Sequence, residues 1–403
     1  MRLTRATLAP LLFASLTFCL AARAEARQAQ GASAEARRLA SSADDYAATL
    51  GGRREALRRL EEAARLHSEA GEGAEAARAL NRAGRLRLLL SETRASLEAH
   101  LRALSLLRRA PDAEAEADAL NGLGETYVHL QQKGQAERAL RRSLAVSERG
   151  GYGRGRAHAL VTLSVVQIYK DQALAMATAE EALALWRSLG DPRGLALAHS
   201  QVGRCHFAQN RLAESAQNYE SAVQLWRGLR DRPGEAGALI MLGFVEYRKG
   251  EWRANIERLT QAQALLDEEA EPLMMGQIAA GLAEAFNEAG LPEDGLRHFG
   301  RALEYYRRTQ NPHLIWYATW GLGGTHLLLG DYPAAFDHLR RSLEGVDADG
   351  AEAAQTHHYL GRTYLAAGDT AAALRHFRTA LDHYERRRNP NWAARPRGLM
   401  GQA

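Results

Sequence analysis

The sequence repeats with a period of about forty residues, and this periodicity constrains the fold more than any other feature. Successive copies are 38 to 40 residues apart. A fixed period of this size is typical of repeat architectures, in which each copy is one supersecondary unit stacked on its neighbours. We call the small or short residues that mark the register reference positions: Asp44, Gly84, Gly124, Ser164, Gly203, Gly243, Ala283, Gly323 and Gly361.

Each copy continues with the same residue pattern. In the copy centred on Gly124, the small residue Ala136 is followed by the large residue Leu140 and then by the small residue Ser143. Residues three and four apart share one helix face, so small residues let two antiparallel helices approach while the large one fills the space between them. If its turn is one residue shorter, the copy centred on Ser164 keeps the pattern with Ala175, Ala179 and Ala182.

The pattern has two departures and clear boundaries. Asn255 replaces a small residue and His100 replaces a large one.

Asp or Asn before Pro, as at Asp191, Asp231 and Asn311, predicts helix starts. No stretch alternates apolar and polar residues for long enough to predict a strand. Residues that suit a helix C-cap lie between the expected helices of a copy: Gly134, Asn210, Gly250, Gly290, Gly330 and Gly368.

These features resemble the tetratricopeptide repeat, whose motif joins Leu-Gly-x-x-Tyr to a small residue, an aromatic residue and another alanine. The match is closest at residues 123–127 and 360–364 and extends over about residues 34 to 386. The resemblance implies an all-α fold, a right-handed superhelical solenoid of about nine antiparallel helix pairs. HEAT-type repeats, whose periods are also near forty, are the alternative, but the Leu-Gly-x-x-Tyr motif favours tetratricopeptide repeats.

The first residues have the pattern of an export signal. Arg2 and Arg5 precede an apolar run, and Ala22-Arg23-Ala24 has the small-x-small form of a cleavage site. The run is short and interrupted for a membrane span, so we place cleavage after Ala24. We therefore predict a signal peptide over residues 1–24 and an exported bacterial protein, periplasmic or secreted, without membrane association after cleavage. An uncleaved anchor is the alternative.

Cleavage alters the charge and the cysteine content. Loss of Arg2, Arg5 and Arg23 lowers the formal net charge from +4 to +1. A nearly neutral chain gives no reason to expect nucleic acid binding. Cys205 then remains without a partner cysteine, so we expect packing, not an internal disulfide, to stabilise the exported chain.

The resemblance also implies a binding surface. In this family the first helix of each copy lines a concave face, with inward residues six and three positions before the reference residue and one, four and five positions after it. Earlier copies place polar residues there, including Asn81, Arg85, Asn121 and Glu125. Later copies place aromatic, aliphatic and arginine side chains there: Val165, Ile168, Tyr169, Arg204, Phe207, Ile240, Phe244, Tyr247, Arg248, Tyr317 and Trp320.

Aromatic and arginine residues are enriched in binding hot spots. We therefore expect an exported, non-catalytic scaffold that binds a peptide or protein segment on this face. The alternative is that some of these side chains pack between neighbouring copies.

Catalytic and metal-binding patterns are weak. Cys205 and His206 are adjacent, but neighbours on a helix point about a hundred degrees apart and do not form a nucleophile–base pair. His357 and His358 have no second cluster at metal-ligand spacing, and neither His-Glu-x-x-His nor a Gly-x-x-x-x-Gly-Lys motif occurs. We predict no enzymatic activity, no cofactor and no metal.

The C-terminal end suggests a second hypothesis. We predict the solenoid over residues 25–388 and a short basic tail over 389–403, too short to cover Phe377, Leu381 and Tyr384. We expect this end either to associate with another chain or to continue into a longer protein. An export signal followed by forty-residue repeats also resembles the N-terminal region of bacterial CHAT-domain proteins. The chain would then be the recognition arm of a truncated or split caspase-like protease or regulatory protein.

Overall fold

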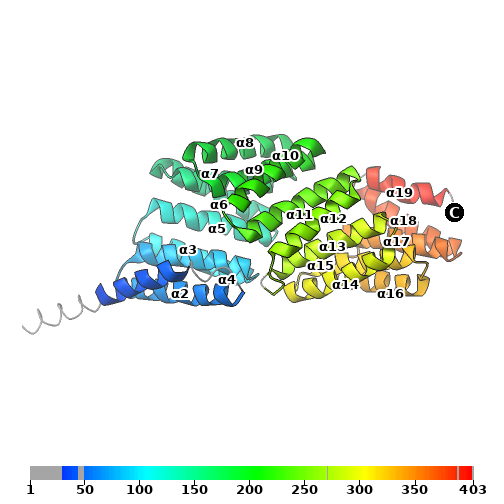
Figure 1. Ribbon diagram of the computed structural model, residues 1–403, viewed down its shortest axis with the longest axis horizontal. Coiled ribbons are helices and arrows are strands. Elements are labelled where there is room, and N and C mark those ends of the chain that lie inside the picture. The colour runs from blue at the N-terminus through cyan, green and yellow to red at the C-terminus, as the bar shows by residue number, and fades with distance from the viewer. Residues whose placement is uncertain (1–29, 44–49, 270, 388–389, 402–403) are drawn as a thin grey trace, which may run out of the picture. The chain divides into compact units, whose positions relative to one another are not determined.

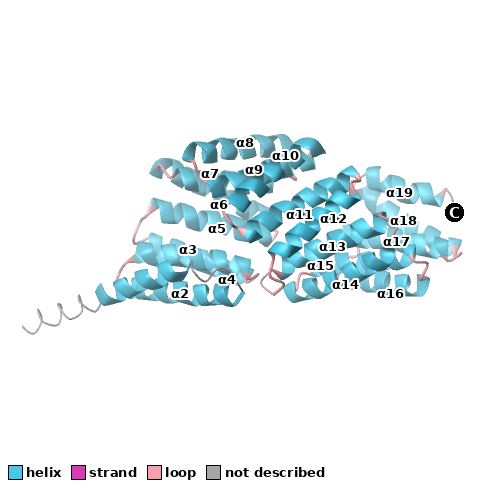
Figure 2. Ribbon diagram, viewed as in Figure 1, coloured by secondary structure: helices cyan, strands magenta, loops and turns pink. Residues whose placement is uncertain are grey.

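The computed structural model describes residues 30–43, 50–269, 271–387 and 390–401. Helices joined by short loops make up these residues, and no strand occurs among them (Figure 2). The predicted all-α repeat fold is therefore confirmed. The predicted signal peptide, its cleavage site at Ala24 and the reference residue Asp44 lie outside the described residues.

The chain divides into two compact units, Met1–Gln209 and Asn210–Ala403, which we call unit 1 and unit 2 (Figure 1). The division falls between α9 and α10. Unit 1 contains a helix over residues 30–42 and then α2 (Leu50–Glu69), α3 (Gly73–Leu89), α4 (Thr93–Leu107), α5 (Ala113–His129), α6 (Lys133–Gly150), α7 (Gly153–Gln167), α8 (Gln172–Leu189) and α9 (Pro192–Ala208).

Each copy consists of a first helix followed by a second helix, and unit 2 continues this order, beginning with the second helix α10. It contains α10 (Leu212–Gly228), α11 (Arg232–Lys249), α12 (Trp252–Leu265), α13 (Pro272–Glu288), α14 (Pro292–Thr309), α15 (Pro312–Leu328), α16 (Tyr332–Ser342), α17 (Ala351–Ala366), α18 (Thr370–Arg386) and α19 (Pro390–Met400).

First helices form the inner layer of each unit. In unit 1, α3, α5, α7 and α9 contact one another in sequence, and in unit 2 α11, α13, α15 and α17 do the same. Second helices of the described chain pack mainly against first helices and make no comparable contact with one another. Because the first helices lie closer together, each unit curves toward their side.

The reference glycines allow this close packing. A Cβ placed on Gly323 would lie 2.6 Å from Leu339 Cγ, and one on Gly361 would lie 2.5 Å from Phe377 Cε1. The large residue of a second helix also contacts the first helix of the next copy. Phe299 of α14 does so, because a Cβ on Gly321 of α15 would overlap its ring. Each large residue of a second helix thus fills a space that small residues of two first helices leave open.

The two departures from the pattern fit the same spaces. The His100 ring occupies the space between Gly84 and Gly122, and its Nδ1 lies 3.3 Å from Asn81 Oδ1. Asn255 donates a hydrogen bond of 2.6 Å from Nδ2 to the carbonyl oxygen of Gly243. Both polar side chains are fully buried and gain a partner there. The shorter turn of the fourth copy is also confirmed, with Ala175, Ala179 and Ala182 buried.

Helix boundaries follow the predicted capping residues, with one exception. The side chains of Asp191, Asp231 and Asn311 accept hydrogen bonds from backbone amides in the first turns of α9, α11 and α15. Gly134 was wrongly assigned to a turn, because it lies inside α6. Gln131 adopts the left-handed conformation instead, with φ of 59°, since α5 ends two residues earlier.

The predicted C-terminal tail is in fact a helix. Residues Pro390–Met400 form α19, which packs against α18. Ala393 is buried with Tyr384, Ala380 and Ala354, so the end that we expected to be uncovered has an apolar contact. Arg397 also forms an ion pair with Glu385. A helix of this length covers the last pair because alanines allow close approach, as in the other interfaces.

In each of the last three copies, a histidine of the second helix stacks on a ring of the first helix at an equivalent position. The ring centroids lie 5.2 or 5.3 Å apart. The pairs are His298 on Phe286, His338 on His326, and His376 on Tyr364. Nδ1 of His376 also lies 2.9 Å from Nδ1 of His357, which requires one neutral ring to accept from the other. Burial lowers the pKa of His298, His338 and His376, to about 4 for His376.

Two glycine substitutions test the helix boundaries. Gly134→Ala should stabilise the chain by about 0.5–1 kcal/mol, since this residue is helical and its added Cβ has room. Gly330→Ala should destabilise it by about 1–2 kcal/mol, because Gly330 has φ of 75°. Denaturant unfolding of both variants measures the two effects. Destabilisation by Gly134→Ala would show that our boundary of α6 is wrong.

Acidification should destabilise unit 2 as the stacked histidines become protonated. Their folded pKa values lie below the ordinary value of 6.5, so the unfolded chain binds more protons. Their contribution is complete above about pH 6.5 and is lost as the pH falls toward about 4. Thermal unfolding across this range should show a shallower decline for His376→Phe, which keeps a stacking ring without a titrating group. An unchanged slope would argue against this cause.

Candidate binding site

The predicted binding residues of unit 1 differ widely in exposure. Tyr169 is 79% exposed, with the Lys133 ammonium 4.5 Å from its ring centre. Ile168 is only 5% exposed because it packs with Ala175 and Met176, so its inclusion in the binding face was wrong. Val165 and Phe207 are half-buried and Arg204 is exposed.

Several charged side chains on the first helices of unit 1 lie within ion-pair distance of one another. Arg85 lies 3.4 Å from Asp118, and Glu125 pairs with His158. Burial alone would raise the pKa of Glu125, but His158, Arg85 and His100 lower it to about 2. Both Asp118 and Glu125 on this part of the first-helix face therefore have a basic partner.

Two asparagines that we expected on the inner face are buried between copies. Asn81 donates from Nδ2 to the Ala115 carbonyl at 2.9 Å, and Asn121 donates to the Gly155 carbonyl at 3.0 Å. Each bond joins one first helix to the next. Both residues lie three positions before the reference residue, where the structure favours packing over exposure.

Four predicted residues of unit 2 lie on α11. Ile240 is 2% exposed and belongs to the core, so it too was wrongly assigned to the surface. Phe244 and Tyr247 are half-buried, and the Tyr247 ring lies 5.1 Å from that of Trp252. Arg248 is exposed and donates a hydrogen bond of 3.0 Å to Asn210.

Tyr317 and Trp320 on α15 begin a continuous group of rings. Their centroids lie 6.1 Å apart, and Trp320 meets Tyr359 of α17 edge to face at 4.7 Å. All three side chains are half-buried. The Trp320 Nε1–H has no hydrogen-bond acceptor among the described residues. The Arg362 guanidinium lies over the Tyr359 ring, 4.7 Å from its centre.

Two carboxylates of α13 complete this surface. The Tyr317 hydroxyl donates a hydrogen bond to Glu284 Oε1. Burial, together with the charge of Glu288, raises the pKa of Glu284, although the bond from Tyr317 opposes the rise. Burial also raises the pKa of Tyr247, as do Glu284, Glu288 and Tyr359, so these groups share one neighbourhood.

We call this surface the aromatic–acidic face of unit 2 and define it by Tyr247, Glu284, Glu288, Tyr317, Trp320 and Tyr359. Sequence reasoning found three of its six members. Glu284 and Glu288 obey the same positional rule, one and five residues after Ala283, but only aromatic, aliphatic and arginine residues were predicted to bind in these later copies. Tyr359 lies two residues before Gly361, outside the rule.

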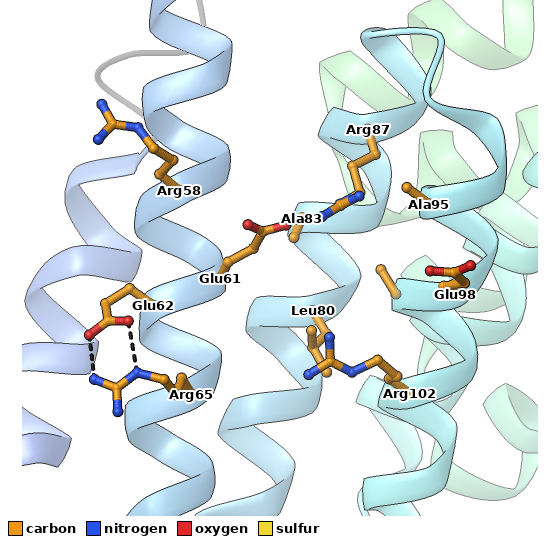
Figure 3. A pocket seen from close by; sticks show the side chains of 11 residues that line it. Arg58, Glu61, Glu62, Arg65, Leu80, Ala83, Arg87, Ala95, Glu98 and Arg102 are labelled. Atoms are coloured by element: carbon orange, nitrogen blue, oxygen red, sulfur yellow. Dashed lines mark hydrogen bonds and ion pairs between the residues drawn. The ribbon is translucent and has the colours of Figure 1, made fainter.

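A separate pocket of about 480 Å³ lies in unit 1 between α2, α3 and α4 (Figure 3). Internal ion pairs neutralise much of its lining: Arg65 pairs with Glu62, and Arg87 pairs with Glu61. None of the predicted binding residues lines it. Its mixed and largely paired charges do not define a ligand class.

The pair Cys205 and His206 does not have the environment of a catalytic dyad. Cys205 is buried among Val202, Ile168 and Met176, and burial raises the pKa of its thiol. A protonated thiol in an apolar environment is a poor nucleophile.

In the described part of the chain, no three His, Cys, Asp or Glu side chains converge in an arrangement that could hold a metal ion. None of the helices described combines the length and the apolar composition that a bilayer crossing requires.

Comparison with known sequences gives two matches. Residues 275–348 and 317–386 each match the tetratricopeptide repeat family, over the helices that carry most of the aromatic–acidic face. A stretch of 131 residues, 32% of this chain, is 37% identical to Regulatory protein AfsR of Streptomyces griseus. The match spans 13% of that protein's length.

Solved structures with similar folds cover most of the chain. The apo form of the quorum sensor NprR from B. thuringiensis aligns with a TM-score of 0.56 at 13% identity, over 87% of this chain and 97% of that one. A Rap protein complexed with competence and sporulation factor aligns at 0.51 and 14% identity, over 79% and 97%. Apo RapI aligns at 0.51 and 13% identity, over 66% and 95%. At such identities the likeness concerns the fold alone.

The periodic packing, the curvature toward the first helices and the family match all indicate the same kind of fold. The described residues have a helical-repeat fold of the tetratricopeptide type, and residues 275–348 and 317–386 match that family.

Proposed function

We propose that this chain is a non-catalytic scaffold that binds a peptide or protein segment on the aromatic–acidic face of unit 2. The observation that carries the proposal is the grouping of the half-buried rings of Tyr317, Trp320 and Tyr359 on α15 and α17, with the half-buried Tyr247 of α11 in the same neighbourhood. Large rings that keep part of their surface in water on one face are typical of interaction sites.

Two further observations support this proposal. First helices line the side toward which the unit curves, so a bound segment can contact several copies at once. Among the similar structures, one is a quorum sensor and another is complexed with competence and sporulation factor. We further propose that residues 1–24 direct export to the periplasm or the exterior, with cleavage after Ala24.

One observation favours the recognition-arm hypothesis as a second candidate. The match of 131 residues to part of a regulatory protein suggests that such repeats can belong to a larger regulator. In that case the same face would bind the segment that the regulator senses.

Substitutions on the face test the binding proposal. Peptides selected from a random display library on the purified chain should bind Tyr247→Ala and Trp320→Ala at least about tenfold more weakly, because each change removes a hot-spot ring. Tyr169→Ala, which removes an exposed ring from unit 1, should bind them unchanged. Helicity and thermal unfolding confirm that each variant is folded. Equal binding by folded Tyr247→Ala and Trp320→Ala would refute the proposed surface.

A binding role also predicts that Glu284 does not stabilise the free chain. The folded pKa of Glu284 is raised, so its favourable contribution is complete below the ordinary value of 4.5 and is lost as the pH rises through the folded value. Glu284→Gln keeps an acceptor for Tyr317 and should match or exceed the wild-type melting temperature at about pH 7. The variant should lose this relative advantage at about pH 4. A clear loss of stability at neutral pH would contradict the prediction.

A further inference from the structure

Charge on the aromatic–acidic face is unbalanced, unlike elsewhere on the first helices. In unit 1, Asp118 has Arg85 and Glu125 has His158 within ion-pair distance. In unit 2, the Glu284 carboxylate has the Tyr317 hydroxyl as its partner, and neither Glu284 nor Glu288 forms an ion pair with a described residue. The face therefore carries two carboxyl groups that have no cationic partner among the described residues.

The carboxylates of Glu284 and Glu288 lie next to each other on the surface of α13. Glu284 and Glu288 are four residues apart on α13, so they point to the same side of the helix, where like charges repel. Tyr317 binds only one oxygen of Glu284, which leaves the second oxygen as an acceptor. A cation at this position would relieve both the repulsion and the unfavourable burial of Glu284.

Aromatic rings flank the carboxylates on both sides. Tyr247 lies on α11 and Tyr317 on α15, the first helices that adjoin α13. The face of a tyrosine ring attracts an ammonium or guanidinium group. The chain's own Arg362 shows this contact with Tyr359. Among the described residues, no lysine or arginine lies over the ring of Tyr247 or Tyr317.

We propose that the segment bound on this face presents an arginine or lysine side chain, which docks between Glu284 and Glu288 against the rings of Tyr247 and Tyr317. This inference rests on the proposed function and specifies its ligand. Carboxylates supply the ion pair, and the rings contact the aliphatic part and the face of the cationic group. A peptide with an acidic or neutral residue at this position would leave the buried carboxylate uncompensated.

Matched peptides test the charge of the ligand. A selected peptide is synthesised with arginine, with its neutral isostere citrulline, or with glutamate at the anchoring position, and is titrated by fluorescence anisotropy. The arginine peptide should bind at least about tenfold more tightly than the citrulline peptide, and the glutamate peptide should bind most weakly. The advantage of arginine should shrink as salt concentration rises.

Three variants locate the effect. Glu284→Gln should abolish the advantage of arginine over citrulline, and Glu288→Gln should reduce it, while both variants bind the citrulline peptide like the wild type. Glu304→Gln removes one exposed negative charge from α14 of the same unit and should leave the advantage intact. Glu288 is exposed, so its substitution does not disturb the fold.

Two results would overturn the inference. The first is equal binding of the arginine and citrulline peptides by the wild type, and the second is an arginine advantage that survives in both Glu284→Gln and Glu288→Gln. In either case the segment would still bind on this face, without a cationic anchor. If no peptide of any charge binds the wild-type chain, the proposed function fails together with this inference.

Discussion

The fold depends on the contact between a large side chain of each second helix and small residues of two first helices. Leu259 illustrates it: a Cβ on Gly243 would lie 3.3 Å from this side chain, and one on Gly281 would lie 2.9 Å from it. The same contact joins the two helices of a copy and joins that copy to the next. Its repetition gives neighbouring copies a similar spacing and brings the first helices together on one side.

Because a few positions in each copy provide this packing, the remaining first-helix positions can vary without loss of the fold. The two units use that freedom differently. In α3 and α5 of unit 1 these positions hold polar side chains that have partners, such as Glu125 with His158. Unit 2 fills them with rings and with two carboxylates that have no cationic partner among the described residues. Uncompensated polar groups in an otherwise consistent structure are expected at functional sites.

The periodic features could be predicted from the sequence because they depend on residues three and four apart. The helix pairs, the capping aspartates and the shortened turn before Ala175 all follow from such spacing. Gly134 was assigned wrongly because glycine is common in turns, whereas the position of the left-handed residue depends on where α5 ends. The division between α9 and α10 leaves the forty-residue period intact.

The binding face was predicted only in part because exposure depends on contacts between copies. Ile240, Asn81 and Asn121 occupy the same position relative to the reference residue, and all three are buried in the long helices of this chain. Glu284 joins the face through Tyr317, which is 33 residues away in sequence. Such a pairing is set by the stacking of α13 on α15, and no local pattern announces it. The helix α19 was missed because its packing depends on the small size of Ala393.

Amide hydrogen exchange with and without an arginine-bearing peptide tests the central claim most directly. We claim that ligands bind to the first helices of unit 2 and that the second helices serve as support. The peptide should slow exchange in α11, α13, α15 and α17, with much smaller changes in α12, α14, α16 and α18. Protection confined to unit 1, or spread equally over both helices of each pair, would contradict the claim.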